Sequence, residues 1–343
     1  MNKNLNGRQE MVQATGLGAC FVTGGAGFIG SHLAERLLAA GNRVTVYDNL
    51  SLGKREWIAH LLSEPRFRFV EADLRDMDAL KEAMAGHDLV FHLGANTDIP
   101  RGNQDTRLDL ENDIIATYNV LEVMRQLGVR KLLFASSSTV FGEPSVRPTP
   151  EAVGPLLPIS LYGAGKLACE GLISAYCHLF DTKAWIFRFG NVVGARMGHG
   201  ILHDFIAKLR QNPEELEILG DGNQEKNYFL VEDCIDGILF ALGNANSRDC
   251  DVFNLGCEST VTATEIARMV VEEMGLPQAR FRYTGGQRGW PGDVPVVIYD
   301  VNKMKELGWR AKHSSAEAVR IGARRLLSQQ QPVGAPLGAP PSG

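Results

Sequence analysis

Short apolar runs alternate with amphipathic segments along the first half of the chain. The apolar runs predict strands at residues 19–23, 43–47, 67–70, 89–92, 131–135 and 184–187. Between them, apolar residues repeat at helical spacing over residues 29–40, which end at Gly41, and over residues 113–127, which precede Gly128. This order of strand, helix and strand predicts an α/β fold built on a doubly wound parallel sheet.

The pattern becomes less regular after residue 190. Helical stretches over residues 201–211, 231–242 and 262–274 alternate with turns rich in Gly and Pro. Such a pattern favours a smaller C-terminal lobe packed on the edge of the sheet over further parallel units. We therefore expect a sheet domain over residues 18–190 and mainly a second lobe over residues 191–327.

Both ends of the chain differ from this pattern. Residues 1–17 are polar and aperiodic, and residues 328–343 are rich in Pro and Gly, so we expect both segments to be disordered. The sequence contains no run of 18 apolar residues, and its first 20 residues lack the apolar core of a secretory signal. These features predict a cytosolic protein without a membrane span.

Composition and charge narrow the class of ligand. The chain has 343 residues, of which 44% are hydrophobic and 22% are charged, as in folded globular proteins. With 35 Lys and Arg against 40 Asp and Glu, the net charge of −5 gives no general attraction to nucleic acid or to an anionic membrane. An anionic ligand therefore needs a local site. The six cysteines include no C-x-x-C pair, which indicates buried free thiols.

A glycine-rich loop follows the first predicted strand. Residues 21–33 read FVTGGAGFIGSHL and contain both G-x-G-x-x-G and G-x-x-G-x-x-G spacing before a helix. Glycines allow the backbone to approach a pyrophosphate, and the N-terminus of the helix supplies amide donors. This arrangement predicts a Rossmann-type dinucleotide site. The cofactor contacts expected in this segment are Gly24, Gly27, Phe28, Ile29 and Gly30.

The end of the second predicted strand carries a carboxylate that suits NAD. Asp48 follows Gly30 by 18 residues, where an acidic side chain receives the ribose hydroxyls. The residues beside Asp48 are not basic, which favours NAD over NADP. We also expect cofactor contacts from Asn49 and, near the adenine, from Asp73 and Leu74. A solvated Asp at the end of a strand is the alternative interpretation of Asp73.

Hydroxyl and amine groups suited to proton transfer occur farther along the chain. The segment SLYGAGKLACE places Tyr162 and Lys166 four residues apart, on one face of a helix. A tyrosine with a pKa of about 10 becomes a usable base when a neighbouring ammonium favours the phenolate. The strand at residues 131–135 ends in a run of hydroxyl residues that includes Ser137. The carboxyl edge of a parallel sheet is where such folds bind ligands.

These motifs together resemble the extended short-chain dehydrogenase/reductase family, in its branch of nucleotide-sugar epimerases and dehydratases. The resemblance spans about residues 18–325 and rests on TGGAGFIG, the strand-end Asp, SSSTVFG, YGAGK and RFGNVVG. It implies a bound NAD, Tyr162 as the catalytic base and acid, and Ser137 as its hydroxyl partner. Lys166 would hold the nicotinamide ribose and lower the pKa of the tyrosine. Phe141 departs from the usual Tyr of this family.

The residues after Ser137 bear on the reaction. Dehydratases of this family carry an Asp-Glu pair there, whereas this chain has Ser138 and Thr139, as the 4-epimerases commonly do. The resemblance thus implies a nucleotide-sugar 4-epimerase that acts by reversible oxidation at C4. A 4,6-dehydratase or 4-keto reductase remains an alternative, and a dinucleotide-binding sensor without catalytic activity is an alternative of another class.

The resemblance also implies a nucleotide-diphosphate sugar as substrate, bound mainly by the lobe over residues 191–327, and a homodimer formed through helices near residues 112–127 and 162–180. The implied substrate contacts are Ser137, Ser138, Thr139, Asn191, Leu219, Lys226 and Arg288. Lys226 stands where relatives usually have Arg, and Trp290 occupies the place of a phosphate-binding arginine. His199 and His203 suggest no metal site, because no third ligand is evident. The sequence does not identify which sugar and which nucleotide base the substrate carries.

Overall fold

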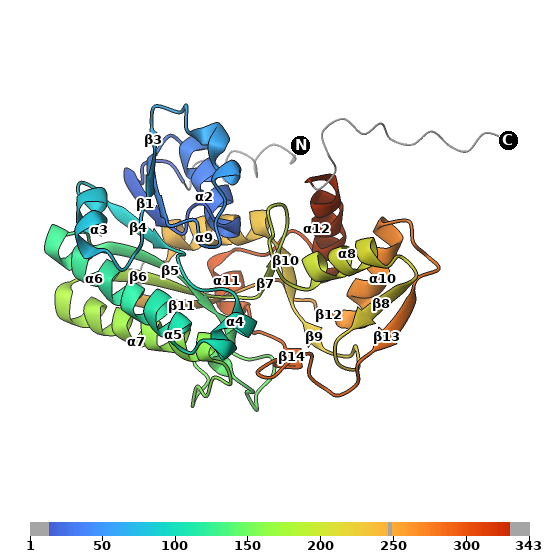
Figure 1. Cartoon of the computed structure of the whole chain (residues 1–343). Coiled ribbons are helices and arrows are strands. Elements are labelled where there is room, and N and C mark those ends of the chain that lie inside the picture. The colour runs from blue at the N-terminus through green and yellow to red at the C-terminus, as the bar shows by residue number, and fades with distance from the viewer. Residues whose placement is uncertain (1–13, 246–248, 330–343) are drawn as a thin grey trace, which may run out of the picture.

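The computed structural model describes residues 14–245 and 249–329 and is built around a seven-stranded sheet (Figure 1). All neighbouring strands of this sheet run parallel, in the order β11-β6-β5-β4-β1-β2-β3. The strands are β1 (Ala19–Thr23), β2 (Arg43–Asp48), β3 (Phe67–Glu71), β4 (Leu89–His92), β5 (Lys131–Ser137), β6 (Lys183–Phe189) and β11 (Cys250–Leu255). The predicted α/β fold with a doubly wound parallel sheet is confirmed.

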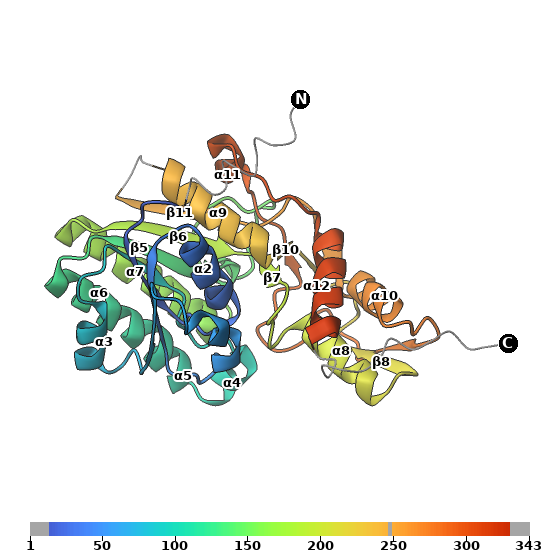
Figure 2. The same cartoon turned by 90° about the horizontal axis from the view of Figure 1, so that it is seen from above.

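Helices cover both faces of the sheet, as Figures 1 and 2 show. One face carries α2 (Phe28–Ala39) and α9 (Val231–Asn244), and the other carries α3 (Met77–Met84), α6 (Ala116–Leu127) and α7 (Leu161–Phe180). Alternate side chains of β1 therefore enter different cores. Cys20 and Val22 pack with α2 and α9, whereas Phe21 packs with α3, α6 and α7. Burial on both faces explains why the strands are continuous apolar runs.

The helix predicted over residues 113–127 begins irregularly. It follows α4 (Ile99–Gln104) and α5 (Arg107–Asp109), and its first part is a π-helix, η3 (Leu110–Ile115), before α6 continues to Gly128. Gly128 ends α6 with a φ of 73°. The π-helix shifts the residues of its turn relative to a regular helix.

The C-terminal part returns to the sheet, which corrects the expectation that no further parallel units follow residue 190. β11 pairs with β6 from Cys250↔Ala184 to Leu255↔Phe189, and α9 leads into it across the face that α2 also covers. Next to this edge lies α11 (Asn302–Leu307), whose Met304 is part of the same core. The boundary expected at residue 190 therefore does not separate the sheet from the rest of the chain.

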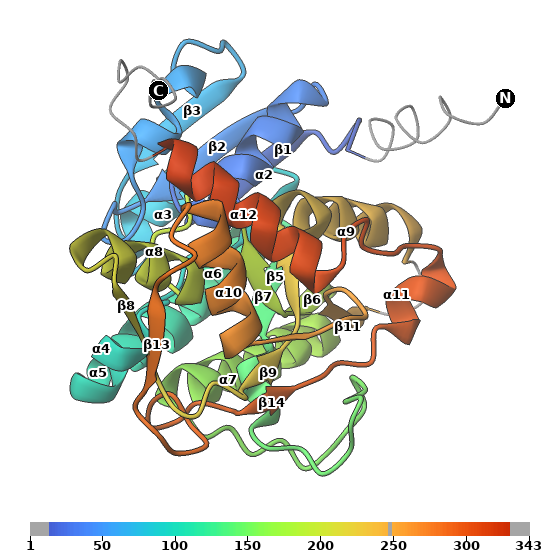
Figure 3. The ribbon, with the colours of Figure 1, turned by 90° about the vertical axis from the view of Figure 1, so that its right-hand side faces the viewer.

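The remaining elements form a second lobe with its own core, seen from the side in Figure 3. Its helices are α8 (Ile201–Gln211), α10 (Ala263–Glu273) and α12 (Ser315–Gln329). Its strands are β7 (Asn191–Val193), β8 (Glu215–Ile218), β9 (Glu225–Lys226), β10 (Tyr228–Leu230), β12 (Val261–Thr262), β13 (Arg280–Tyr283) and β14 (Val296–Val297). They form small sheets in which β10 pairs with β7, β9 with β12 and β14, and β8 with β13. None of the helices described combines the length and apolar character needed to span a membrane.

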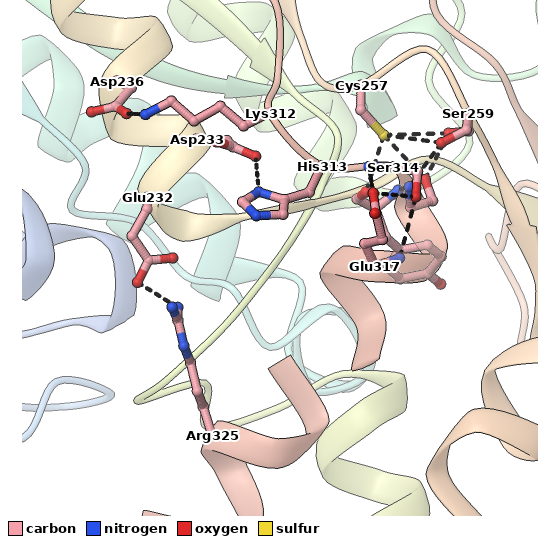
Figure 4. A network of polar contacts seen from close by, with 12 residues as sticks. Glu232, Asp233, Asp236, Cys257, Ser259, Lys312, His313, Ser314, Glu317 and Arg325 are labelled. Atoms are coloured by element: carbon pink, nitrogen blue, oxygen red, sulfur yellow. Dashed lines mark hydrogen bonds and ion pairs between the residues drawn. The ribbon is translucent and has the colours of Figure 1, made fainter. Parts of the chain in front are cut away.

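Polar contacts fasten this lobe to α9 (Figure 4). The acidic residues of α9 meet basic residues of α12 and of the segment before it. The pairs are Glu232 with Arg325 at 2.5 Å, Asp233 with His313 at 3.0 Å and Asp236 with Lys312 at 2.9 Å. The helix that covers the sheet is thus also a support for the second lobe.

The chain ends are ordered slightly beyond the predicted limits. Residues 14–17 pack on the sheet domain, where the Asn42 side chain donates to the Ala14 carbonyl oxygen at 2.6 Å and accepts from the Leu17 amide at 3.0 Å. At the other end, α12 includes Ser328 and Gln329. The rest of the segments expected to be disordered, residues 1–13 and 330–343, lies outside the described residues.

Candidate active site

The glycine loop joins β1 to α2 at the carboxyl edge of the sheet. Gly24 has a φ of 65°, and a Cβ there would lie 2.7 Å from the Gly94 nitrogen. A Cβ on Gly30 would collide with the carbonyl oxygen of Gly24, so both positions need glycine for the loop to close against the helix. The predicted glycines therefore lie together in one tight turn.

The first turn of α2 leaves backbone donors free for an anion. Gly27 is the N-cap and contributes no side-chain acceptor, and its own amide bonds to the Gly24 carbonyl oxygen at 3.0 Å. The amides of Phe28 and Ile29 then point out of the helix end, because the first amides of a helix have no partner within it. This end of α2 fits the diphosphate of a dinucleotide.

Asp48 lies at the end of β2, beside the glycine loop. Its Oδ2 accepts from the Ala26 amide at 3.0 Å and its Oδ1 from the Leu50 amide at 2.8 Å. Burial raises the pKa of this carboxyl, and the two hydrogen bonds oppose the shift. A carboxylate retains further lone pairs beyond these two bonds. Its place next to the loop fits the ribose hydroxyls of a bound dinucleotide.

The residues expected around the adenine are already engaged with one another. Asn49 donates to Asp73 Oδ2 at 2.9 Å, and Arg75 binds both carboxylate oxygens of Asp73 at 2.9 Å. These contacts, led by Arg75, hold the pKa of Asp73 well below its usual range. Leu74 lies next to Gly94, close to the glycine loop. The structure thus places all three residues near the cofactor loop but gives the Asp73 carboxylate a structural partner.

The hydroxyl groups of Ser137 and Tyr162 meet at the end of β5. Ser137 is the last residue of β5, and its Oγ accepts from the Thr139 amide at 3.2 Å as the cap of η4 (Ser138–Phe141). Tyr162 lies in the first turn of α7, close enough to Ser137 for the serine hydroxyl to influence it. Burial raises the pKa of Tyr162, while the charge of Lys166 and the nearby Ser137 hydroxyl lower it. The predicted pair is therefore assembled.

Lys166 lies one turn after Tyr162 and is buried. Its Nζ donates to the Ala135 carbonyl oxygen at 2.9 Å and lies 5.7 Å from the centre of the Tyr162 ring. Burial opposes the charged form, but the negative charges of Tyr162 and Asp113 outweigh it, so the pKa of Lys166 is raised. Lys166 is therefore a firmly held cation beside the tyrosine.

The two residues after Ser137 present hydroxyl groups instead of carboxylates. Ser138 and Thr139 form the start of η4, and Gly163 packs against the backbone of Thr139. Within the described part of the chain, the Thr139 Oγ1 is buried and has no hydrogen-bond partner. This oxygen fits a role in holding a ligand hydroxyl.

Three of the residues predicted to bind the substrate meet around residues 287–293. Lys226 Nζ forms an ion pair with Asp293 and lies 5.0 Å from the centre of the Trp290 ring. Leu219 lies against Gly289 and is 42% exposed. Arg288 Nη1 donates to the Asp293 carbonyl oxygen at 2.5 Å. Trp290 thus stacks on the very lysine that would neutralise a phosphate.

Asn191 lies apart from this group. It begins β7, and its side-chain amide donates to the Asn227 carbonyl oxygen at 3.0 Å. Asn191 therefore fastens β7 to the turn before β10. This bond uses the side-chain nitrogen of Asn191, so the side-chain carbonyl oxygen can still accept a hydrogen bond.

An ion pair joins the second lobe to the segment that follows η4. Arg288 Nη2 lies 2.7 Å from Glu143 Oε1, and Glu143 follows η4 by two residues. The pair connects two segments that are 145 residues apart. Glu143 could not be predicted from the sequence, because nothing in its local pattern marks a long-range partner.

Two buried polar groups of the site were also missed. Asp109 and Asp113 lie near Lys166, and each influences its pKa. Glu170, one turn after Lys166, binds Arg188 through two bonds of 3.0 and 2.7 Å and accepts from Ser136 Oγ at 2.5 Å. Glu170 could have been found from the sequence, because it lies four residues after Lys166 and therefore on the same face of the helix.

His199 and His203 lie just before and in α8. Within residues 14–245 and 249–329, no group of three or more His, Cys, Asp or Glu side chains is placed to hold a metal ion. His199 lies in the loop before α8, and burial lowers its pKa. His203 lies on α8 beside Asp204 at 3.5 Å.

The comparisons with known proteins agree with this geometry. A sequence profile described as the NAD dependent epimerase/dehydratase family matches residues 20–256. The chain belongs to this family. NAD is therefore its cofactor, and the residues of the glycine loop and Asp48 fit that group. The resemblance of the chain to the nucleotide-sugar epimerase branch of the extended short-chain dehydrogenase/reductase family is confirmed.

Epimerases are prominent among the relatives. The chain is 32% identical over 306 residues to a putative UDP-glucose 4-epimerase of Methanocaldococcus jannaschii, covering 87% of this chain and 95% of the relative. A crystal structure of a UDP-galactose 4-epimerase is 39% identical, with a TM-score of 0.81, and the match covers 91% of this chain and all of the other. The Thermus thermophilus UDP-glucose 4-epimerase in complex with NAD is 32% identical over 90% of this chain and 98% of that chain, with a TM-score of 0.78.

Other activities occur in the same family. UDP-glucuronic acid decarboxylase 1 of Arabidopsis thaliana is 30% identical over 90% of this chain and 68% of its own. A dTDP-glucose 4,6-dehydratase structure from Streptomyces venezuelae is 26% identical with a TM-score of 0.82, covering 89% of this chain and 96% of the other. Membership of the family therefore does not by itself decide the reaction.

Proposed function

We propose that the chain is an NAD-dependent nucleotide-sugar 4-epimerase that acts by reversible oxidation at C4 of the sugar. The observation that carries this proposal is the assembly of Ser137, Tyr162 and Lys166 with hydroxyl residues, not carboxylates, at Ser138 and Thr139. A 4,6-dehydratase needs an additional acid and base, which neither hydroxyl supplies at neutral pH. The similarity to several 4-epimerases supports the same choice.

The proton chemistry follows from three side chains. Tyr162 takes the proton of the sugar 4-hydroxyl, and Ser137 holds the reacting oxygen through a hydrogen bond. Lys166 stabilises the phenolate by its charge. The glycine loop and Asp48 would hold NAD, which would supply the hydride acceptor and donor for C4. When the 4-keto sugar has turned over in the site, Tyr162 returns the same proton to the oxygen, so no proton has to leave the protein.

The remaining roles concern binding. We assign the cofactor to Gly24, Gly27, Phe28, Ile29, Gly30, Asp48, Asn49, Asp73, Leu74, Tyr162 and Lys166. We assign the nucleotide-diphosphate sugar to Ser137, Ser138, Thr139, Asn191, Leu219, Lys226 and Arg288. Two observations support these roles. Thr139 Oγ1 is buried without a hydrogen-bond partner among the described residues, and the second lobe supplies two cations, Lys226 and Arg288.

A homodimer formed through α6 and α7 is part of the proposal. The exposed side chains of Tyr118 on α6 and Leu179 on α7 support it, because they leave apolar surface on these helices. Light scattering of the purified protein at micromolar concentration tests this point, and a monomeric mass would contradict it.

The deciding experiment is product analysis in deuterated water. Purified protein is incubated without added cofactor with UDP-, GDP-, ADP-, CDP- and dTDP-sugars, and the products are examined by proton NMR and mass spectrometry. A product of unchanged mass, inverted at C4 and free of solvent deuterium, supports the epimerase. Tyr162→Phe serves as the matched control, because it removes one hydroxyl and should abolish turnover while the protein retains NAD.

Other outcomes identify the alternatives. Loss of water with deuterium on the sugar carbons indicates a 4,6-dehydratase, and net consumption of NADH indicates a 4-keto reductase. Loss of carbon dioxide from a UDP-uronic acid indicates a decarboxylase. A Tyr162→Phe protein with full biological activity would instead favour a sensor that binds NAD without catalysis.

A further inference from the structure

Two buried carboxylates lie beside the catalytic helix, and no step described above uses them. Asp109 is the last residue of α5, and Asp113 lies in the π-helix η3. Their side chains belong to residues that are only 2% and 1% exposed. π-helical turns are frequent at functional sites because they redirect side chains out of regular spacing.

One asparagine holds both carboxylates. The Asn96 amide donates to Asp113 Oδ1 at 2.8 Å, and the Asn96 side chain donates to Asp109 Oδ1 at 2.8 Å. The second oxygen, Oδ2, of each carboxylate is buried and has no hydrogen-bond partner in the described part of the chain. A buried carboxylate oxygen without a donor is costly unless a proton or a nearby cation compensates its charge.

Lys166 is the cation that can compensate them. A Cβ on Gly165 would lie 3.2 Å from Asp113 Oδ2, so Asp113 packs against the turn of α7 that carries Tyr162 and Lys166. The Cys169 thiol, also on α7, donates to the Asp113 carbonyl oxygen at 3.4 Å. Because Gly165 has no side chain, the Asp113 carboxylate can lie close to the turn that carries Lys166.

The charges around Lys166 come from several elements. Tyr162 and Cys169 face it from α7, Asp109 from α5 and Asp113 from η3. His92, on β4, is influenced by the charge of Lys166, and burial together with that charge lowers its pKa to about 3, so it is neutral. A buried ammonium requires an opposite charge. When both are ionised, Asp109 and Asp113 carry two negative charges, one more than is needed to balance Lys166.

We propose that Asp113 is a positioning residue that acts through Lys166: its buried carboxylate balances the ammonium beside Tyr162 and thereby sets the pH range in which Tyr162 accepts a proton. The proposal rests on the function proposed above. Asp113 touches neither the sugar nor the reacting atoms in this role. Asp109 is a weaker partner of the same kind.

The direction of the effect follows from the charges. Burial raises the pKa of Asp113 to about 6, and the charge of Lys166 opposes this shift. Above that pH the carboxylate is ionised, offsets the ammonium and so raises the pKa of Tyr162. Below that pH the carboxyl is neutral, and Lys166 acts on Tyr162 with its full charge. The ionised state of Asp113 therefore restrains formation of the phenolate.

The test uses the NAD-bound protein and compares wild type, Asp113→Asn and Asp109→Asn. Each substitution keeps the size of the side chain and the acceptor for Asn96 but removes the charge. Ultraviolet absorbance of the phenolate, with the signal of Tyr162→Phe subtracted, gives the titration of Tyr162. We expect Tyr162 to titrate at lower pH in Asp113→Asn than in wild type, with a smaller shift in the same direction in Asp109→Asn.

Turnover provides a second readout. In Asp113→Asn, kcat should exceed that of wild type by about threefold at pH 7.5, because more of the tyrosine is ionised, and the ratio should approach one near pH 5, where the wild-type carboxyl is also protonated. A merely structural role would lower kcat equally at all pH values. An unchanged Tyr162 titration in a folded Asp113→Asn protein with normal NAD content would overturn the proposal.

A further measurement covers the case in which Asp113→Asn does not fold. Carbon-13 NMR of the carboxyl groups follows the titration of Asp113 in wild type and in Lys166→Met. Removal of the ammonium should move this titration to higher pH, and an unchanged midpoint would contradict the proposal. Neither titration needs a sugar, so both distinguish a failure of this inference from a failure of the proposed epimerase activity.

Discussion

Lys166 Nζ donates a hydrogen bond to the carbonyl oxygen of Ala135 at 2.9 Å and thereby joins α7 to β5. Ala135 lies two residues before Ser137, and Lys166 lies four residues after Tyr162. The bond therefore fixes the helix that carries the tyrosine against the strand that carries its hydroxyl partner. Lys166 contributes position as well as charge.

We expect Lys166→Met to lower kcat by about 10²-fold or more, because it removes both the ammonium beside Tyr162 and the bond to β5. Lys183→Met is a suitable control, since Lys183 begins β6 and takes no part in the site. Initial rates of C4 inversion measure the effect, together with the NAD content of each protein. A variant that keeps wild-type kcat would remove Lys166 from the proposed mechanism.

Asp48 should determine retention of the cofactor. Asp48→Ala removes the acceptor of two backbone amides and the carboxylate proposed to bind the ribose. We expect NAD to bind about tenfold more weakly, equivalent to about 1.4 kcal/mol. Fluorescence titration of protein freed of NAD measures this, with Asp78→Ala on the exposed side of α3 as control. Equal affinities in the two variants would argue against the assignment.

The pair of Glu143 and Arg288 competes with the proposed diphosphate contact. Both side chains are about two-fifths exposed, at 43% and 41%, so their own attraction is weak. Glu143→Gln should free Arg288 and lower the KM for the nucleotide sugar about threefold at low salt, with little change in kcat. Arg288→Met should raise KM. Glu56→Gln, which alters an exposed pair with Lys54, is the control.

If Arg288→Met left KM unchanged, Arg288 would serve only to join the second lobe to Glu143. The same series in added salt separates the two roles. An electrostatic contact with a diphosphate weakens as salt increases, so the difference between Glu143→Gln and wild type should shrink.

The buried ion pair of Glu170 and Arg188 should matter for stability. The side chains of both residues are at least 92% buried, since their exposed fractions are 8% and 5%. Glu170→Gln leaves the guanidinium without its charge partner, which should cost about 3 kcal/mol in the free energy of unfolding. The double variant Glu170→Gln, Arg188→Met should cost less than the sum of the single changes. Urea unfolding of the NAD-bound protein measures all three, and additive effects would contradict the expected coupling.

Much of the sheet could be predicted because each strand is a local apolar run. β4 occupies its predicted residues, and β5 and β6 extend the predicted runs by two or three residues. β11 could not be recognised in the same way. Its partner β6 lies more than 60 residues earlier in the chain, and the position of β11 in the sheet depends on that long-range pairing.

In the candidate site too, residues in local motifs could be predicted, whereas residues brought together only by folding could not. Ser137, Tyr162 and Lys166 stand in compact motifs, so spacing alone was enough to group them. Asp113 was not found, because helical periodicity predicts a regular helix from residue 113 and gives no sign of a π-turn. Its neighbour Asn96 comes from the loop after β4, and only the folded chain brings the two together.

The return of β11 to the sheet determines how the chain can be divided. A fragment that stops at residue 190 would leave the backbone groups of β6 unpaired along one side and would strip α9 from the face it shares with α2. Such an edge is prone to pair with other chains. The nucleotide-binding half is therefore not a module that can be cut out, grafted or swapped by itself, because its last strand, β11, is made only after α8 and the first strands of the second lobe.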